Sequence, residues 1–210
     1  MKRTSRASRG LVIALTGGIA CGKSTVGRFM EAQGAALLDT DEVAHALLNR
    51  GAVSDQVIGR FGQGILGPDG VIDRAKLGRL IFGDDEARRA LNELTHPAVM
   101  AEVRRWLKEA TGAGRDAVVI IPLLFEIGAT DGWNAIVCVV ADEWIALERM
   151  LSRGLAEPDA RRRMAAQWPV AEKAKHSDFV ITNNTDLRTL ESETAEVYRK
   201  IREKEKKAHV

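Results

Sequence analysis

Cysteine is scarce in this chain, and long apolar runs are missing. The 210 residues include two cysteines, Cys21 and Cys138, which lie far apart and show no metal-type spacing. Their scarcity favours a reducing compartment, which we expect to be the cytoplasm. No segment approaches the roughly 18 consecutive apolar residues that a membrane-spanning helix needs. The sequence therefore predicts neither a cysteine-ligated metal site nor a membrane span.

A secretion signal, internal repeats and low-complexity segments are also missing. Residues 1–9 carry four basic and no acidic side chains, but the apolar stretch that follows is too short for a signal peptide. Residues 199–207 carry six basic and two acidic side chains. Because the net charge is +2, the chain between these basic ends is mildly acidic. We interpret 1–10 and 204–210 as solvated tails rather than contacts for nucleic acid or anionic lipid, and we expect no nucleic-acid or membrane partner.

One segment carries a complete phosphate-binding loop. Residues Gly17–Ser24 read G-G-I-A-C-G-K-S, which matches G-x-x-x-x-G-K-[ST]. An apolar run at 11–15 precedes the loop as a buried strand, and a helical pattern over 23–33 follows it. The glycines let several backbone N–H groups face one point, where the helix N-terminus adds partial positive charge. This context favours binding of a nucleoside triphosphate over a glycine-rich turn without a ligand.

The loop residues have separate expected roles. Lys23 is expected to reach the β- and γ-phosphates, and the hydroxyl of Ser24 to ligate Mg²⁺. A thiol near a helix N-terminus, such as that of Cys21, tends toward a lowered pKa, although a merely tolerated small loop residue is the favoured interpretation. The expected nucleotide contacts in this segment are Gly18, Ile19, Ala20, Cys21, Gly22, Lys23, Ser24 and Thr25.

Apolar runs alternate with helical patterns along the chain, which predicts an α/β fold with parallel strands covered by helices on both faces. Hydrophobic residues make up 45 % of the chain, enough for a sizeable core. The expected strands are 11–16, 35–39, 117–122, 135–140 and 178–182. The expected helices are 23–33, 41–50, 53–60, 74–81, 84–93, 97–111, 143–152, 157–166, 170–176 and 186–203.

Two regions interrupt this alternation. Residues 41–111 are helical in pattern without a strand, so we expect a helical subdomain there, and the glycine-rich stretch Gly59–Gly70 reads as a loop with a turn at Pro68–Gly70. The arginine-rich segment 153–168 is expected to form a lid. A single domain over 11–203 would then combine these parts with a nucleotide-binding core made of 11–40, 112–152 and 169–203.

Two aspartates follow the second expected strand. Ligands of open α/β sheets bind outside the carboxyl ends of the strands, so Asp39 and Asp41 are expected near the phosphate loop. One carboxylate would accept the proton of an acceptor hydroxyl, and the other would hold Mg²⁺ through water. The alternative for Asp41 is a helix cap or first-turn acid.

Arginines gather around the expected lid. Arg149 and Arg153 are four apart and project from one helical face, with Arg161, Arg162 and Arg163 beyond them. Guanidinium groups delivered to a triphosphate would neutralise transition-state charge and exclude water. The alternative is a solvated helix face, which we expect for Arg161 and Arg162.

Further candidates follow the third expected strand and occupy the helical region. Leu124 and Phe125 are expected to line an acceptor pocket and Glu126 to bind a polar group there, or else these residues form a plain buried strand exit. His96-Pro97 is typical of a helix start, with Pro97 at the first helical position.

Taken in order, these pieces resemble the dephospho-coenzyme A (dephospho-CoA) kinase family over about residues 11–200. The motifs that carry the resemblance are Leu15–Ile19, Gly22–Thr25, Asp39–Asp41, Asp69–Arg74, His96-Pro97, Pro122–Glu126, Arg149, Arg153, Arg163, Gln167 and Asp178–Asn183. Two departures are Cys21, where the family usually has serine, and Gly154, where an acidic residue is usual.

The resemblance implies a five-stranded parallel core, a coenzyme-binding helical subdomain and a mobile lid. It implies transfer of phosphate from ATP, with Mg²⁺, to the ribose 3′-hydroxyl of dephospho-CoA, in a monomer or weak homo-oligomer. Asp41 would be the catalytic base, assisted by Lys23 and Arg149. The ATP contacts would extend to Arg149, Arg153 and Asn183, and the acceptor contacts would be Asp39, Asp41, Arg74, His96, Leu124, Phe125, Glu126 and Arg163.

Two alternatives stay open. A nucleoside monophosphate kinase or another small-metabolite kinase would share the loop, the aspartates and the lid. A GTP-dependent switch would carry the same loop, and Asn183–Asp186 is similar to the guanine-reading N-K-x-D sequence, although its lysine is missing.

Overall fold

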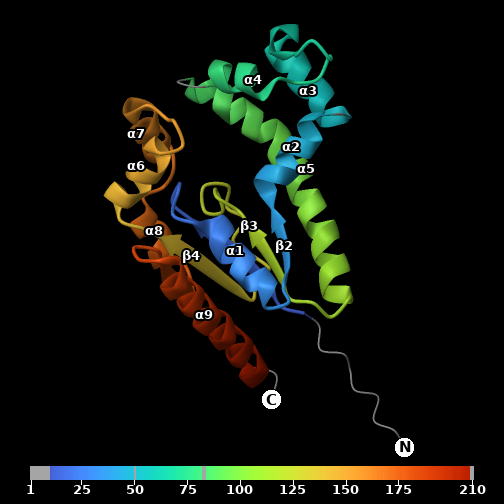
Figure 1. Ribbon diagram of the computed structural model, residues 1–210. Helices are drawn as coiled ribbons and strands as arrows, with labels where there is room; N and C mark the ends of the chain where they lie inside the picture. The colour runs from blue at the N-terminus through green and yellow to red at the C-terminus, as the bar shows by residue number, and fades with distance from the viewer. Residues whose placement is uncertain (1–9, 50, 82–83, 209–210) are drawn as a thin grey trace, which may run out of the picture. The chain divides into compact units, whose positions relative to one another are not determined.

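Among residues 10–49, 51–81 and 84–208, which are those the structure describes, five parallel strands form one sheet in the order β2–β3–β1–β4–β5. Figure 1 shows this computed structural model. Each expected strand is present, and the third ends two residues earlier than expected. The predicted five-stranded parallel sheet is therefore confirmed. The strands are β1 (Val12–Gly17), β2 (Ala36–Asp39), β3 (Ala117–Ile120), β4 (Ala135–Val140) and β5 (Phe179–Thr182).

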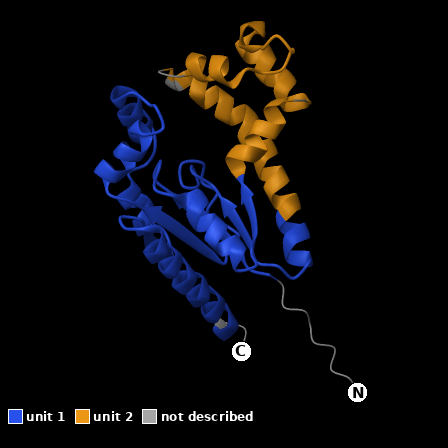
Figure 2. Ribbon diagram, in the orientation of Figure 1, with its two compact units in different colours: residues 1–39, 107–210 blue, residues 40–106 orange. Residues whose placement is uncertain are grey.

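The chain divides into two compact units (Figure 2). We call residues 1–39 and 107–210 the sheet unit, and residues 40–106 the helical unit. The expected insertion, 41–111, ends five residues later than the helical unit, which ends at Trp106. Besides the strands, the sheet unit holds α1 (Lys23–Ala32), α6 (Glu143–Leu151), α7 (Glu157–Ala165), α8 (Val170–Lys175) and α9 (Leu187–Ala208).

The core of the sheet unit follows from strands that are apolar on both faces. Ile13 and Leu15 of β1 are fully buried and belong to a cluster that includes Met30 of α1 and Leu190 of α9. Helices α1 and α9 pack against each other, while α8 packs against β1 and β4. Full burial of one such aliphatic side chain contributes about 1.5–3 kcal/mol. Burial of these apolar side chains therefore fixes the central strand β1, which leads into the phosphate loop.

The helical unit has a small core of its own. Its elements are α2 (Thr40–Asn49), α3 (Ala52–Phe61), the 3₁₀ helix η1 (Gln63–Ile65), α4 (Arg74–Ile81) and most of α5 (Asp85–Gly112). Val57, Ile65, Ile72 and Leu77 form its buried cluster. The loop expected over 59–70 is therefore wrong in its first half, because apolar residues there continue α3 and form η1.

The turn expected at Pro68–Gly70 is present. Gly70 has a φ of 75° and donates its N–H to the carbonyl of Gly67 at 3.1 Å. The side chain of Asp69 accepts the N–H of Val71 at 3.2 Å. A left-handed glycine after Pro-Asp is the chemistry that such a turn requires.

The helix start expected at His96-Pro97 is wrong. Both residues lie inside one 28-residue helix, α5, in place of the two helices expected over 84–93 and 97–111. An internal proline removes one helical hydrogen bond and costs about 3 kcal/mol. Burial of Ala87 before Pro97, and of Val99 and Val103 after it, offsets that cost. Packing on both sides of the proline therefore keeps the helix continuous.

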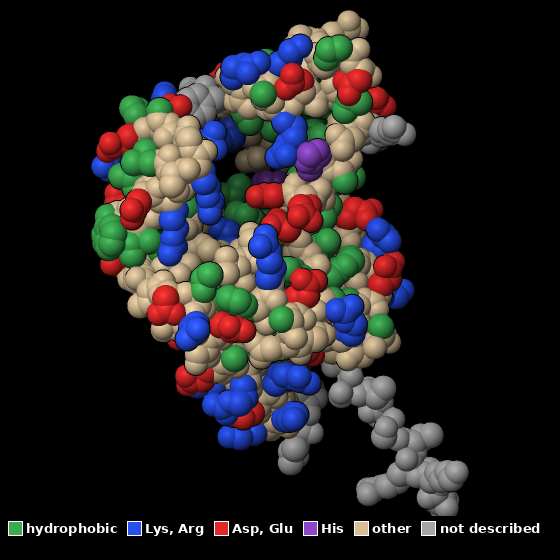
Figure 3. Space-filling view, viewed as in Figure 1, with side chains coloured by type: hydrophobic (Ala, Val, Ile, Leu, Met, Phe, Trp, Pro, Cys, Tyr) green, Lys and Arg blue, Asp and Glu red, His purple; other side chains and the backbone are tan. Residues whose placement is uncertain are grey.

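The tail expected at 204–210 is also partly wrong, because α9 continues to Ala208. Lys and Arg side chains gather over this end of α9 (Figure 3). Several of them form ion pairs, including Arg199 with Glu203 at 2.7 Å and Lys204 with Asp178 at 3.5 Å. The tail expected at 1–10 lies, except for Gly10, outside the described residues. Within the described part of the chain, each helix is too short or too polar to cross a membrane.

Candidate nucleotide and acceptor sites

The phosphate loop, between β1 and α1, takes a backbone path that depends on its glycines. Gly17 has a φ of 143°, and a Cβ there would lie 2.1 Å from the carbonyl oxygen of Val139. Gly22 has a φ of 100°, and a Cβ there would lie 2.2 Å from Nδ2 of Asn183. Ala20 also has a positive φ, 56°. A side chain at either glycine would thus disturb both the loop and the strand ends beside it.

Lys23, the first residue of α1, folds back over the loop. Its Nζ donates to the carbonyls of Gly18 at 2.8 Å and Gly17 at 3.3 Å. An ammonium group beside the N-terminus of a helix favours the binding of an anion there. The role of Lys23 at the β- and γ-phosphates stays a prediction.

The far side of the loop is supported from β5 and α6. Asn183 is buried, and its Nδ2 donates to the carbonyl of Cys21 at 2.9 Å. Arg149 donates to the backbone carbonyl of Asn183 at 3.0 Å, to its Oδ1 at 3.3 Å and to the carbonyl of Ala20 at 3.3 Å. Arg149 and Asn183 thus meet at the loop. The sequence singled out both residues but carried no sign that one supports the other.

Cys21 differs from the expectation for a thiol near a helix N-terminus. Its side chain is 2 % exposed, and burial raises its pKa, against the smaller opposing effect of Lys23. The tendency toward a lowered pKa is not realised, because loss of water outweighs the positive charges nearby, and this agrees with the favoured interpretation of Cys21 as a small loop residue. Burial likewise raises the pKa of Cys138 to about 11. Both cysteines therefore favour the neutral thiol.

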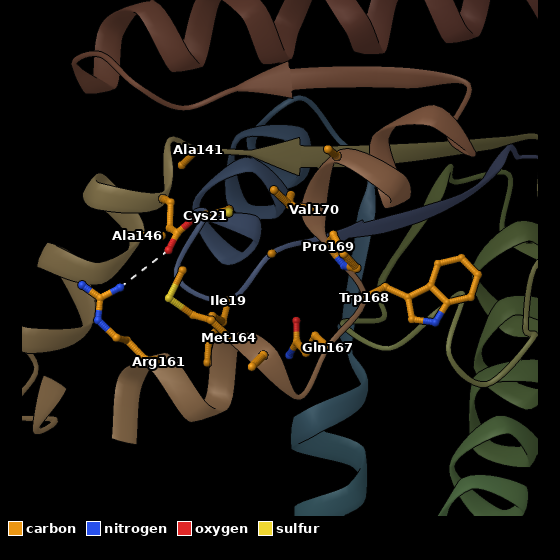
Figure 4. A pocket seen from close by; sticks show the side chains of 14 residues that line it. Ile19, Cys21, Ala141, Ala146, Arg161, Met164, Gln167, Trp168, Pro169 and Val170 are labelled. Carbon is orange, nitrogen blue, oxygen red and sulfur yellow. Dashed lines mark ion pairs between the residues drawn. The ribbon is translucent and has the colours of Figure 1, made fainter. Parts of the chain in front are cut away.

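A pocket of about 460 Å³ lies beside the loop (Figure 4). Ile19 and Cys21 line it from the loop, and Met164 and Gln167 from the expected lid. Arg161 reaches Glu143 of α6 at 3.7 Å. The remaining lining residues are Gly18, Ala141, Ala146, Ala165, Trp168, Pro169, Val170 and Ala171.

The lid arginines lie on α7 and just after α6, and they are exposed. Arg161 and Arg162 form ion pairs with Glu157 and Asp159 on their own helix, as expected for solvent-facing residues. Arg153 and Arg163 are also exposed. Arg149, by contrast, contacts the phosphate loop directly, through the carbonyl of Ala20.

In the turn after β3, the side chains of Leu124, Phe125 and Glu126 have different surroundings. Leu124 is fully buried, which fits a plain strand exit better than the lining of a pocket. Phe125 stacks on Trp168, with ring centroids 6.1 Å apart and planes 13° apart. Oε1 of Glu126 pairs with the buried Lys173 at 2.8 Å and accepts the N–H of Trp168 at 2.9 Å. Sequence reasoning missed Lys173, whose partner lies 47 residues away in the chain.

Three polar side chains gather in the helical unit. Asp41 lies in the first turn of α2, which begins at Thr40, and His45 lies one turn further along the same helix face. Nη1 of Arg74, the first residue of α4, lies 2.9 Å from Nδ1 of His45. Arginine can only donate, so Nδ1 of His45 is the acceptor in this contact. Sequence reasoning missed His45, although its spacing from Asp41 was a usable signal.

The remaining acceptor candidates are His96 and Asp39. His96 is half-buried within α5, and burial lowers its pKa. Asp39 ends β2, at the carboxyl edge of the sheet. Asp73, within the motif that ends at Arg74, accepts the N–H groups of Ala75 and Lys76 and caps α4.

Comparisons with known proteins agree with this geometry. A family model described as dephospho-CoA kinase matches residues 11–189. A dephospho-CoA kinase of Geobacillus kaustophilus is 45 % identical over 177 residues, covering 83 % of this chain and 88 % of that protein. Because the family model spans most of the sequence and the similarity is high, this chain belongs to the dephospho-CoA kinase family.

Solved structures show the same fold. The crystal structure of TT1252 from Thermus thermophilus has a TM-score of 0.76 and 30 % identity, covering 92 % of this chain and 98 % of that one. A dephospho-CoA kinase from Campylobacter jejuni has a TM-score of 0.62 and 26 % identity over the same shares. The five-stranded sheet, the phosphate loop and these similarities together identify the chain as a member of the dephospho-CoA kinase family of P-loop kinases.

Proposed function

We propose that this chain transfers the γ-phosphoryl group of ATP to the ribose 3′-hydroxyl of dephospho-CoA, giving CoA and ADP in the last step of CoA biosynthesis. The observation that carries the proposal is the phosphate loop, supported by Arg149 and Asn183, in a chain that belongs to the dephospho-CoA kinase family. The loop supplies the phosphate site, and the family supplies the acceptor.

The sheet unit receives the triphosphate. Backbone N–H groups of Gly18–Thr25 would surround the β-phosphate, and the ammonium group of Lys23 would exchange its carbonyl partners for phosphate oxygens. Arg149 already contacts the loop, so its guanidinium group requires little reorganisation to meet charge that develops in transfer. Arg153 would join it as the lid closes.

Oxygen donors suited to Mg²⁺ are present. Magnesium, when bound, neutralises charge on the β- and γ-phosphates. The hydroxyl of Ser24, exposed in the first turn of α1, and the carboxylate of Asp39 through water are the groups we propose to hold it. Mg²⁺ in kinases is usually held by one or two protein groups with phosphates and water.

The acceptor would be oriented by Asp41 and its neighbours. Asp41 accepts a hydrogen bond from the ribose 3′-hydroxyl and takes its proton as the oxygen attacks phosphorus and ADP leaves. Arg74, paired with His45, offers charge for the acceptor's phosphates. The other proposed acceptor contacts are Asp39, His96, Phe125, Glu126 and Arg163. Leu124 is left out because it has no exposed surface.

A coupled assay of ADP release tests the proposal. The purified protein is given ATP and Mg²⁺ with dephospho-CoA, AMP, pantothenate or buffer alone. We expect turnover with dephospho-CoA to exceed the others by at least an order of magnitude, since a site built for an acceptor rejects analogues that leave its polar groups unpaired. Equal rates with AMP would favour a nucleoside monophosphate kinase instead.

The alternatives are not favoured. Asp186, at the position of the guanine-reading aspartate, accepts the N–H groups of Arg188 and Thr189 and caps α9. Asn184 accepts the N–H of Asp142. Both side chains therefore support strand ends and a helix start. Thermal unfolding with ATP and with GTP provides a direct check, because a ligand that binds the folded state raises the melting temperature.

A further inference from the structure

A lysine with no exposed surface lies in the sheet unit. Lys173, on α8, is among the largest fully buried side chains in the described part of the chain. Burial of an isolated ammonium group is very costly, so buried lysines are paired. Nζ of Lys173 lies 2.8 Å from Oε1 of Glu126 and donates to the carbonyl of Pro122 at 2.8 Å. Its charge is therefore directed at the turn that follows β3.

Glu126 connects that turn to the end of the lid. The Oε1 atom that faces Lys173 also accepts the backbone N–H of Trp168 at 2.9 Å. Trp168 is the last residue of the lid segment, and Pro169 immediately precedes α8. The ring of Trp168 stacks on Phe125, the neighbour of Glu126. A polar contact and an aromatic contact thus hold the same point of the chain.

Pro122 ties the arrangement to the strand that carries the phosphate loop. Its carbonyl accepts from Lys173 and lies 3.5 Å from Oγ1 of Thr16 in β1. Thr16 is fully buried and directly precedes the first glycine of the loop. One ammonium group therefore links the exit of β3, the end of the lid and the strand beneath the loop. Glu126 is also a proposed acceptor contact, whereas Lys173, Pro122 and Thr16 have no proposed contact with a substrate.

We propose that Lys173 is a positioning residue that fixes the hinge of the lid at Trp168 by holding the Glu126 carboxylate. The inference rests on the proposed function, because the lid at 153–168 closes over the nucleotide that this function requires. Buried ion pairs contribute little net stability relative to apolar side chains. In this protein, the two contacts of Oε1 of Glu126 instead fix where Trp168 lies relative to the turn after β3. When Lys173 fixes the position of Trp168, α7 and its arginines move about one defined point. Without Lys173, the lid no longer closes over the phosphate loop in one defined position.

Exchange of the Trp168 amide hydrogen provides a readout that needs no catalysis. We would compare Lys173→Met, which keeps the length of the side chain but removes the charge, with Lys175→Met. Lys175 lies on the same helix and pairs with Glu172 at 2.7 Å, but it is largely exposed, so it is the matched control. We expect Trp168 exchange to accelerate by roughly 10-fold or more in Lys173→Met, and to stay unchanged in Lys175→Met.

Kinetics give the second readout. We expect Lys173→Met to lower kcat for dephospho-CoA phosphorylation by roughly 10- to 100-fold, the scale of a small misplacement of catalytic groups, with the KM for ATP within a few-fold. A merely structural role would lower the active fraction without loosening Trp168 in the folded molecules. Unchanged Trp168 exchange, or kinetics equal to those of Lys175→Met, would overturn the inference.

Glu126→Gln covers the case in which Lys173→Met does not fold. The amide keeps the size and the acceptor oxygen of the carboxylate but loses its charge, so Trp168 exchange is expected to be faster than in the wild-type protein and, where Lys173→Met folds, slower than in that variant. In the double variant, the two effects should not add, because both act through one contact. Multiplicative effects would contradict a shared role. Since Trp168 exchange is measured without substrate, it is informative even if wild-type protein fails to phosphorylate dephospho-CoA.

Discussion

The sheet unit and the helical unit hold their candidate residues in opposite ways. In the sheet unit, the phosphate loop is held by side chains distant in sequence, such as Asn183 on Cys21 and Arg149 on Ala20. In the helical unit, Asp41 and His45 lie one turn apart on an exposed helix, and Arg74 begins another. The first arrangement preorganises a site within the fold, while the second displays polar groups on local elements. We therefore expect changes at the supporting residues Arg149 and Asn183 to affect structure and activity together.

The largest expected effect is in the helical unit. Asp41→Asn keeps the size of the side chain but removes the base, so kcat with dephospho-CoA should fall by roughly 10²- to 10⁴-fold. The KM for ATP and the melting temperature should change little, because Asp41 lies on an exposed helix surface. Steady-state kinetics and thermal unfolding check this prediction.

Glu42→Gln is the matched control for Asp41. Glu42 is also exposed, also acidic and also in the first turn of α2, so it shares any interaction with the helix dipole. Near-normal turnover of Asp41→Asn, equal to that of Glu42→Gln, would mean that Asp41 is a first-turn acid of α2 and not the catalytic base.

Lys23→Ala should have the next largest effect. Removing the ammonium group above the loop should lower kcat by on the order of 10²-fold or more, because its charge follows the γ-phosphoryl group to the transition state. Folding should survive, since Lys23 lies outside the buried core. If Lys23→Ala keeps half of the wild-type activity, the assignment of this loop as the site of the transferred phosphate is wrong.

Arg149→Lys separates contact geometry from charge. Lysine keeps the charge but cannot bridge Ala20 and Asn183 with a planar fork, so kcat should fall by roughly 10-fold or more and the KM for ATP should rise. Arg162→Lys is the control, because Arg162 is exposed and pairs with Asp159 on its own helix. Equal, small effects in both variants would mean that the contacts of Arg149 to the loop do not matter for nucleotide binding.

The smallest expected effect is in the cap of α4. Asp73→Ala should lower the melting temperature slightly, and Asp73→Asn should not, because asparagine caps helices as well as aspartate does. Hydrogen bonds from backbone N–H groups lower the pKa of Asp73, and the bond from the N–H of Lys76 has the largest effect. This contribution to stability is therefore present above the ordinary pKa of an aspartate and is lost as pH falls through the lowered one. Thermal unfolding between pH 7 and pH 3 measures it, and equal losses in both variants would contradict capping.

The fold could largely be predicted from local patterns in the sequence. Apolar runs marked every strand of the sheet, most clearly β1 and β3, which are buried along almost their whole length and are therefore almost continuously apolar. The phosphate loop was recognisable because its glycines and lysine sit at fixed spacing. The missed features of the fold, the continuous α5 and the longer α9, arise where packing or ion pairs extend a helix past a breaker or into a charged segment.

What the sequence by itself determined is the chemistry available at the site: a phosphate loop, acidic groups after β2 and arginines near a lid. Only the tertiary structure decided which of these groups meet. Asn183 contacts Cys21, and Lys173 contacts Glu126, across long stretches of chain. Such contacts leave no periodic pattern in the sequence from which they could be predicted. Burial likewise raised the pKa of Cys21, where the nearby helix start predicted a lower one. The reason is physical: desolvation and long-range pairing depend on which elements pack together, and that is settled by the whole core.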